Sequence, residues 1–152
     1  MKRFLASPAV NAVCISIFSA FYAIVFFLIN ESVVLERDLV DYIGSAWLWW
    51  LWRDFLAAGY HRGLALVLVA VTVLVVVLLL VRRRPHDEYH TAILIRCLVV
   101  AIVLTLIAIA LLYLMILGDT TGVMGKFTLF IAIHWATVVF ANLVYVLLCR
   151  RG

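Results

Sequence analysis

Four long runs of apolar residues constrain this chain more than any other feature of its sequence. They cover residues 9–29, 64–81, 92–117 and 127–149. A helix of about 20 apolar residues crosses the hydrocarbon layer of a bilayer, and each run has about that length. Lipid offers no partners for backbone groups, so a helix is favoured even in the Val-rich second run, which in water would be typical of a strand. The sequence therefore predicts an all-α integral membrane protein with four transmembrane helices.

The composition leaves too little polar surface for a water-soluble protein. Hydrophobic residues make up 68% of the 152 residues and charged residues 13%, whereas soluble domains carry about 25% charged residues. The net charge of +4 does not indicate nucleic acid binding, because the basic residues cluster at the ends of the apolar runs instead of forming a stripe with exposed aromatics. We expect a single membrane domain, with the lipid bilayer as its first partner and no nucleic acid partner.

Basic clusters predict how the four runs are oriented. They lie at residues 2–3, 82–84 and 150–151, each next to the end of a run. Cytoplasmic segments carry an excess of Lys and Arg, so a four-span topology with both termini in the cytoplasm places all three clusters on that side of a cell membrane. The first run is longer than a signal-peptide core, and no small-residue cleavage site follows Asn30, so we expect it to be a retained span.

A Trp-rich segment at residues 38–58 separates the first two runs. Trp prefers the headgroup level, because its ring is apolar while its N–H needs a partner. This predicts an amphipathic helix in the outer interface, ended by Gly59, that anchors the second span. The Trp side chains occupy more than one face of such a helix, so a contact with lipid, with a ligand or with a partner protein is an alternative role. The residues concerned are Trp47, Trp49, Trp50 and Trp52.

Polar residues inside the fourth run share one helical face. His134, Thr137 and Tyr145 recur at helical spacing, and Asn142 lies beside them. Polar groups are costly in lipid, so these residues are candidates for a site. They form either a hydrogen-bonded contact between helices or a solute path through His134, whose side chain titrates near neutral pH. A polar helix contact is favoured, because no Asp or Glu lies within the core of any run.

Small residues repeat at helical spacing in the first and third runs. Such residues let transmembrane helices approach closely, and hydroxyl groups can hydrogen-bond across the contact. The pattern favours self-association or association with another membrane protein. The residues are Ala12, Ser16 and Ala20 in the first run and Ala101, Thr105 and Ala108 in the third.

Two further features of the cytoplasmic side have ordinary explanations. Arg96 lies just inside the third run, and its side chain can extend toward headgroups or Glu88, because helical side chains lean toward the N-terminus. In the hairpin at residues 82–90, His86 and His90 are four apart, a spacing that can share a metal on a helix. Helix initiation explains that segment better, because its acidic residues oppose the positive end of the helix dipole.

The sequence holds no catalytic constellation. The histidines lie at different depths, which argues against a haem held by two of them, and the cysteines fall toward the cytoplasmic third, where structural disulfides are not expected. There is no nucleophile with an adjacent base and no phosphate-binding glycine loop. We therefore expect no enzyme activity, no cofactor and no metal site.

The segment Arg-Pro-His-Asp-Glu-Tyr-His at residues 84–90, followed by two spans and a short basic tail, resembles small uncharacterised prokaryotic membrane proteins with four helices. The resemblance covers about the second half of the chain. It implies a prokaryotic inner membrane and brings no functional residues with it. The sequence as a whole predicts a non-catalytic membrane protein that acts through helix–helix contacts, as an oligomer or as a subunit of a larger complex. The alternative is a transporter or channel whose pathway forms between protomers.

Overall fold

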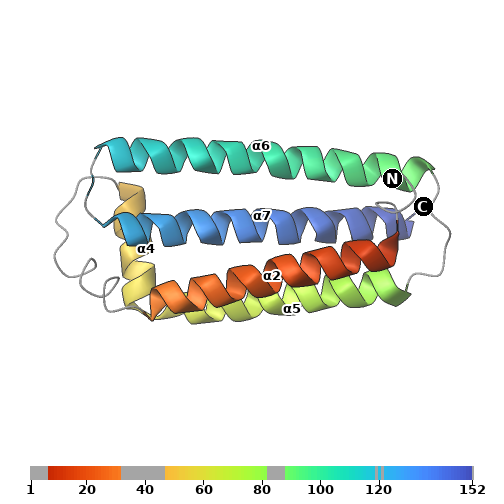
Figure 1. The fold of residues 1–152 in the computed structure, drawn as a ribbon, viewed down its shortest axis with the longest axis horizontal. Coiled ribbons are helices and arrows are strands. Elements are labelled where there is room, and N and C mark those ends of the chain that lie inside the picture. The colour runs from red at the N-terminus through yellow and green to blue at the C-terminus, as the bar shows by residue number, and fades with distance from the viewer. Residues whose placement is uncertain (1–6, 32–46, 82–87, 119, 121, 152) are drawn as a thin grey trace.

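The structure is a computed structural model, which describes residues 7–31, 47–81, 88–118, 120 and 122–151. Four long helices run side by side, and a fifth, shorter helix crosses one end of them (Figure 1). Each of the four is long and apolar enough to cross a membrane. The prediction of an all-α fold with four apolar spans and a further Trp-rich helix is confirmed, and the chain is a multi-pass membrane protein. The helices are α2 (Pro8–Asn30), α4 (Trp47–Ala57), α5 (Tyr60–Val81), α6 (Glu88–Gly118) and α7 (Val123–Arg151).

The helix ends follow from local chemistry. Pro8 occupies the first turn of α2, where its missing N–H and fixed φ are no disadvantage. At the other end of α2, the Asn30 amide donates a 2.7 Å bond to the Phe26 carbonyl and closes the last turn. Gly59 separates α4 from α5 with φ of 76°, a left-handed conformation that suits glycine, as the sequence predicts. Residues 38–46 of the predicted outer segment, and residues 82–87 of the hairpin with His86, lie outside the described residues.

Helices α2, α5 and α7 form the core of the molecule. Helix α2 packs along α5, and both pack on α7. One cluster of buried side chains lies toward the end that α4 crosses, where Phe26 and Trp135 belong to it. A second cluster lies toward the termini and includes Ile15, Val75 and Tyr145. These contacts place three of the four spans in one compact unit.

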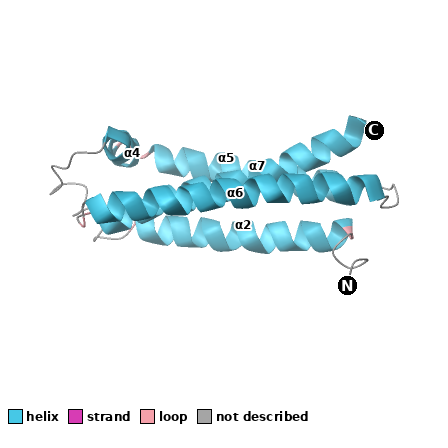
Figure 2. Cartoon of the chain, turned by 90° about the horizontal axis from the view of Figure 1, so that it is seen from above, coloured by secondary structure: helices cyan, strands magenta, loops and turns pink. Residues whose placement is uncertain are grey.

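Helix α6 is attached to this core along one side only. It packs closely on α7 and on no other described helix to a comparable degree (Figures 1 and 2). Its two buried residues in the described range, Ala101 and Ala108, are each 5% exposed and lie seven residues apart on the side that meets α7. The small residues of the third run therefore mark a helix contact. Of the small residues that repeat in the first run, only Ala12 is buried in a helix contact, because Ser16 and Ala20 are exposed.

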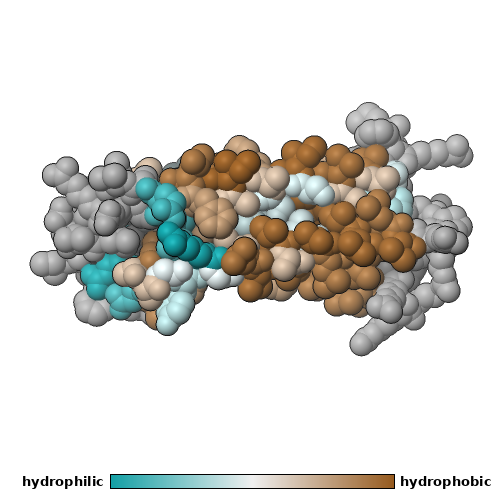
Figure 3. All heavy atoms as spheres, turned by 90° about the horizontal axis from the view of Figure 1, so that it is seen from below, coloured by the Kyte–Doolittle hydropathy of each residue, from teal (hydrophilic) through white to brown (hydrophobic). Residues whose placement is uncertain are grey.

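The face of the long helices seen in Figure 3 is largely apolar, and hydrophilic side chains gather at the end that α4 crosses. Two ion pairs belong to this end. Arg62 contacts Glu31 at 2.7 Å, which links the start of α5 to the end of α2, and Arg53 contacts Asp54 at 3.1 Å within α4. Such a distribution suits helices whose middle faces acyl chains and whose end reaches the headgroups.

Candidate functional site

A chain of hydrogen bonds joins the three core helices near their midpoints. The Trp135 indole N–H donates to the Ser19 hydroxyl oxygen at 2.7 Å, and the Ser19 and Thr72 hydroxyl oxygens are 2.8 Å apart. The Thr72 hydroxyl also donates to the Leu68 carbonyl at 2.8 Å. Each hydroxyl has one proton, so Thr72 must accept the proton of Ser19. The bonds therefore run in one direction, from Trp135 on α7 through Ser19 on α2 to α5.

We call these four residues the Ser19 cluster. The side chains of Ser19, Thr72 and Trp135 are all buried. Lipid offers no hydrogen-bond partner to an unpaired polar group. The hydrogen bonds of the Ser19 cluster therefore favour one arrangement of the three helices. Holding the core together accounts for the Ser19 cluster without any chemical activity.

His134 lies beside this cluster and contacts α2. Its Nδ1 atom is 2.5 Å from the Tyr22 hydroxyl. The imidazole ring also stacks on Phe130 and meets the edge of Phe18, with centroid distances of 5.7 and 5.6 Å. The geometry is that of a polar helix contact, the first of the two roles that the sequence allows.

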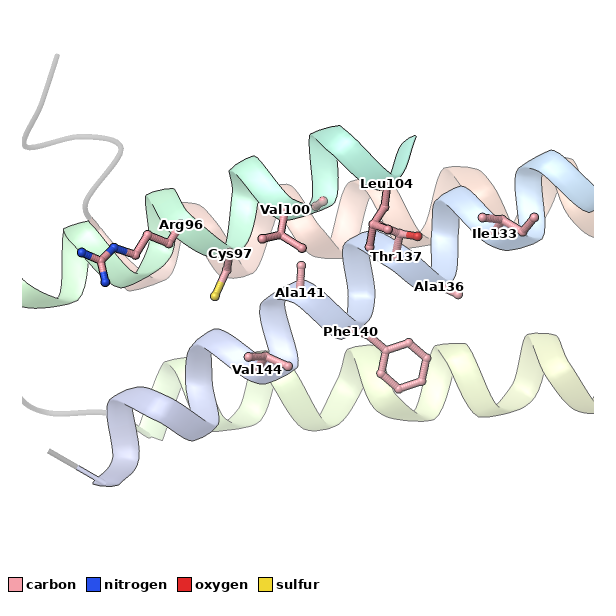
Figure 4. Close-up of a pocket in the computed structure, with 11 residues that line it drawn as sticks. Arg96, Cys97, Val100, Leu104, Ile133, Ala136, Thr137, Phe140, Ala141 and Val144 are labelled. Atoms are coloured by element: carbon pink, nitrogen blue, oxygen red, sulfur yellow. The ribbon is translucent and has the colours of Figure 1, made fainter. Parts of the chain in front are cut away.

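The other predicted polar residues of α7 do not join His134 in a common site. Tyr145 is buried in the core near the termini. The buried Asn142 donates a 2.9 Å bond to the Val138 carbonyl of its own helix, and its Oδ1 has no hydrogen-bond partner within the described ranges. Thr137 instead lines a groove against α6 (Figure 4). The side chains of Tyr145, Asn142 and Thr137 therefore contact different parts of the molecule.

Trp52 connects α4 to the start of α7. Its indole N–H lies 3.2 Å from the Gly125 carbonyl and 3.1 Å from the Thr128 hydroxyl, and its ring stacks on Phe55. Trp52 is buried by its own chain and not by a partner. The side chains of the other three predicted contact residues, Trp47, Trp49 and Trp50, lie outside the described part.

An open groove with a volume of about 580 Å³ lies between α6 and α7. Apolar side chains of both helices line it, and Arg96 lies at one end (Figure 4). The space exists because Ala101, Ala136 and Ala141 are small where bulkier side chains would fill it. Sequence reasoning identifies Arg96 and Thr137 separately but not this groove, because it depends on how the two helices align.

Within the residues that the structure describes, no group of three or more His, Cys, Asp or Glu side chains could hold a metal ion. Comparison with protein families, with curated proteins and with solved structures finds no match to this chain. Three features of the described part are therefore candidates for a functional site. They are the Ser19 cluster, the α6–α7 groove and the side of α6 that does not contact α7.

Proposed function

We propose that the chain is a non-catalytic membrane protein that acts through helix–helix contacts, as an oligomer or as a subunit of a larger membrane complex. The observation that carries this proposal is the position of α6. This helix is long enough to cross the membrane, yet among the described helices it packs closely on α7 alone. In the most apolar stretch of α6, 11% of the residues are buried by the rest of the chain, whereas in that of α7 the share is 39%. A spanning helix with so little cover of its own is free to contact another helix.

The side of α6 that faces away from α7 carries a stripe of large apolar residues. Val99, Leu106 and Tyr113 lie seven residues apart, and therefore nearly in line along the helix. They are 52%, 59% and 63% exposed. We call these three residues the outer stripe. Residues seven apart form the contact line of packed parallel or antiparallel helices, and an apolar line can pair with the same line of a second copy about a twofold axis.

The oligomeric state in a mild detergent tests this proposal. Native mass spectrometry should find a dimer or a higher oligomer of the chain. Leu106→Trp places a bulky ring on the outer stripe and should lower the oligomer fraction. Leu74→Trp makes the same change at an exposed position of α5 and should leave it unchanged. A monomer to which nothing is bound would contradict the proposal.

We also propose that the protein lies in a cell inner membrane with both termini in the cytoplasm. The start of α2 and the end of α7 lie at the same end of the helix bundle (Figure 1), and the basic clusters adjoin that end in the sequence. A green fluorescent protein fused to the C-terminus should fluoresce in cells. A periplasmic alkaline phosphatase that is active at the same position would overturn this orientation.

We do not extend the proposal to a transporter or channel. A pathway lined by His134, Thr137 and Tyr145 would need these side chains to share one space. Instead, His134 contacts α2, Thr137 lines the groove, and Tyr145 is buried in the core near the termini. Solute flux into liposomes that falls in the His134→Ala variant would favour the transporter instead.

A further inference from the structure

The α6–α7 groove has the length of one leaflet of a bilayer. It extends on α7 from Ile133 to Val144, about 16 Å at 1.5 Å per residue. The hydrocarbon layer is about 30 Å thick, so one leaflet contributes about 15 Å. Along α6, the distance from Arg96 to Leu117 is about 32 Å by the same rise. Arg96 thus lies near one edge of the hydrocarbon layer, and the groove runs from that edge to about the middle.

The chemistry of the groove changes at this edge. Its walls are formed by side chains such as Val100, Leu104 and Phe140, whereas its end carries the Arg96 guanidinium. Figure 4 shows the Arg96 side chain directed toward the N-terminal end of α6, away from the apolar walls. The acidic side chains that the structure describes, Glu31 and Asp54, belong to the end that α4 crosses. Neither of these two carboxylates lies near Arg96, and the side chain of Glu88 lies outside the described part of the chain.

We propose that the groove binds an anionic phospholipid, with one acyl chain between α6 and α7 and the phosphate on Arg96. An acyl chain suits an apolar groove that is one leaflet long. A guanidinium forms paired, charge-assisted hydrogen bonds with phosphate oxygens. A spanning helix of a second copy would extend beyond a groove of this length. The groove lies on a different side of α6 from the outer stripe, so this proposal does not depend on the oligomer.

Lipid retention tests the headgroup contact. The full chain in mild detergent is incubated with phosphatidylglycerol or with phosphatidylcholine of the same acyl composition, and bound lipid is counted by native mass spectrometry. We expect phosphatidylglycerol to be retained several-fold more than phosphatidylcholine. Arg96→Gln should make the two equal. Arg62→Gln, which removes an exposed arginine at the opposite end, should preserve the difference. Equal retention of the two lipids by the unaltered chain would overturn the proposal.

Filling the groove tests the acyl-chain contact. Ala141→Leu reduces the space from the α7 side. Val100→Phe reduces it from a position that is 57% exposed, so the larger ring does not have to enter the packed core. Both variants should lose most of either lipid. Val73→Phe, at a similarly exposed position of α5, should retain both.

The Val100→Phe variant also distinguishes a lipid in the groove from a helix of a second copy of the chain. Unchanged lipid retention in Val100→Phe, with helical content unchanged by circular dichroism, would place the lipid elsewhere and refute the proposal. Loss of an oligomer without loss of lipid in the same variant would assign the groove to a second copy and would also refute it.

Discussion

Ser19→Ala is the substitution that best tests how the core is held together. It removes the hydroxyl that connects α2 with both α5 and α7. The Trp135 N–H then loses its acceptor at a fully buried position. Thr72 loses a donor but keeps its own bond to the Leu68 carbonyl. The change therefore breaks two hydrogen bonds and leaves one buried donor unpaired.

The expected loss follows from these two effects. Hydrogen bonds between transmembrane helices contribute about 0.6 kcal/mol each on average, which gives about 1.2 kcal/mol for the two. An unpaired buried donor costs about 1–3 kcal/mol, and the Trp135 N–H is such a group in Ser19→Ala. Together the two effects lower the free energy of unfolding by about 2–4 kcal/mol, which changes the unfolding equilibrium constant by about 30-fold or more.

The measurement is a titration of the purified protein in mixed micelles with dodecyl sulfate, followed by far-ultraviolet circular dichroism. Ser16→Ala is the matched control on the same helix, because its hydroxyl donates only to the Ala12 carbonyl of α2. It should change the free energy of unfolding by less than about 0.5 kcal/mol.

Trp135→Phe combined with Ser19→Ala tests whether the bonds are coupled. The double variant should lose less stability than the sum of the two single variants, because both remove the same contact. The reasoning is refuted by a Ser19→Ala variant as stable as Ser16→Ala, or by strictly additive losses.

Three further predictions use the same titration. Trp52→Phe should lose about 1 kcal/mol, because its N–H donates to α7; unchanged stability would mean that α4 is held by other contacts. Gly59→Ala should lose about 1 kcal/mol, because φ at Gly59 is 76° and an L-residue is strained there. Gly63→Ala, whose added methyl meets nothing within 4 Å, should lose none, and equal effects would contradict the strain. Tyr22→Phe removes the partner of His134 and should lose about 0.6 kcal/mol, whereas a gain would show the pair to be strained.

The number and type of the long helices could be predicted from the sequence, because length and apolarity decide whether a segment spans a membrane. The turn at Gly59 and the contact through Ala101 and Ala108 also have local signals, a glycine after an aromatic run and small residues seven apart. The neighbours of each helix could not be predicted. Helix α6 is apolar around its whole circumference, so its sequence gives no direction to the core.

The Ser19 cluster shows what sequence reasoning missed. Thr72 lies in an unbroken run of Val and Leu and has no polar neighbour in sequence. Trp135 has the signal that could have identified it, because a Trp in the middle of a span is far from the headgroups and needs a partner for its N–H. The groove has no such signal, because it forms where alanines of two helices meet, and their alignment is a property of the folded chain.

Disulfide cross-linking tests most directly whether α6 contacts a second copy of the chain. Single cysteines are placed at Val99, Leu106 and Tyr113, one at a time, in a chain whose own cysteines are replaced by alanine, and are oxidised in membranes. We predict a cross-linked dimer at one or more of these outer-stripe positions. Cysteines at Ala101 and Ala108, which are buried against α7, should give none. Absence of a dimer at all three outer positions, or equal cross-linking at the two alanines, would contradict the proposed function.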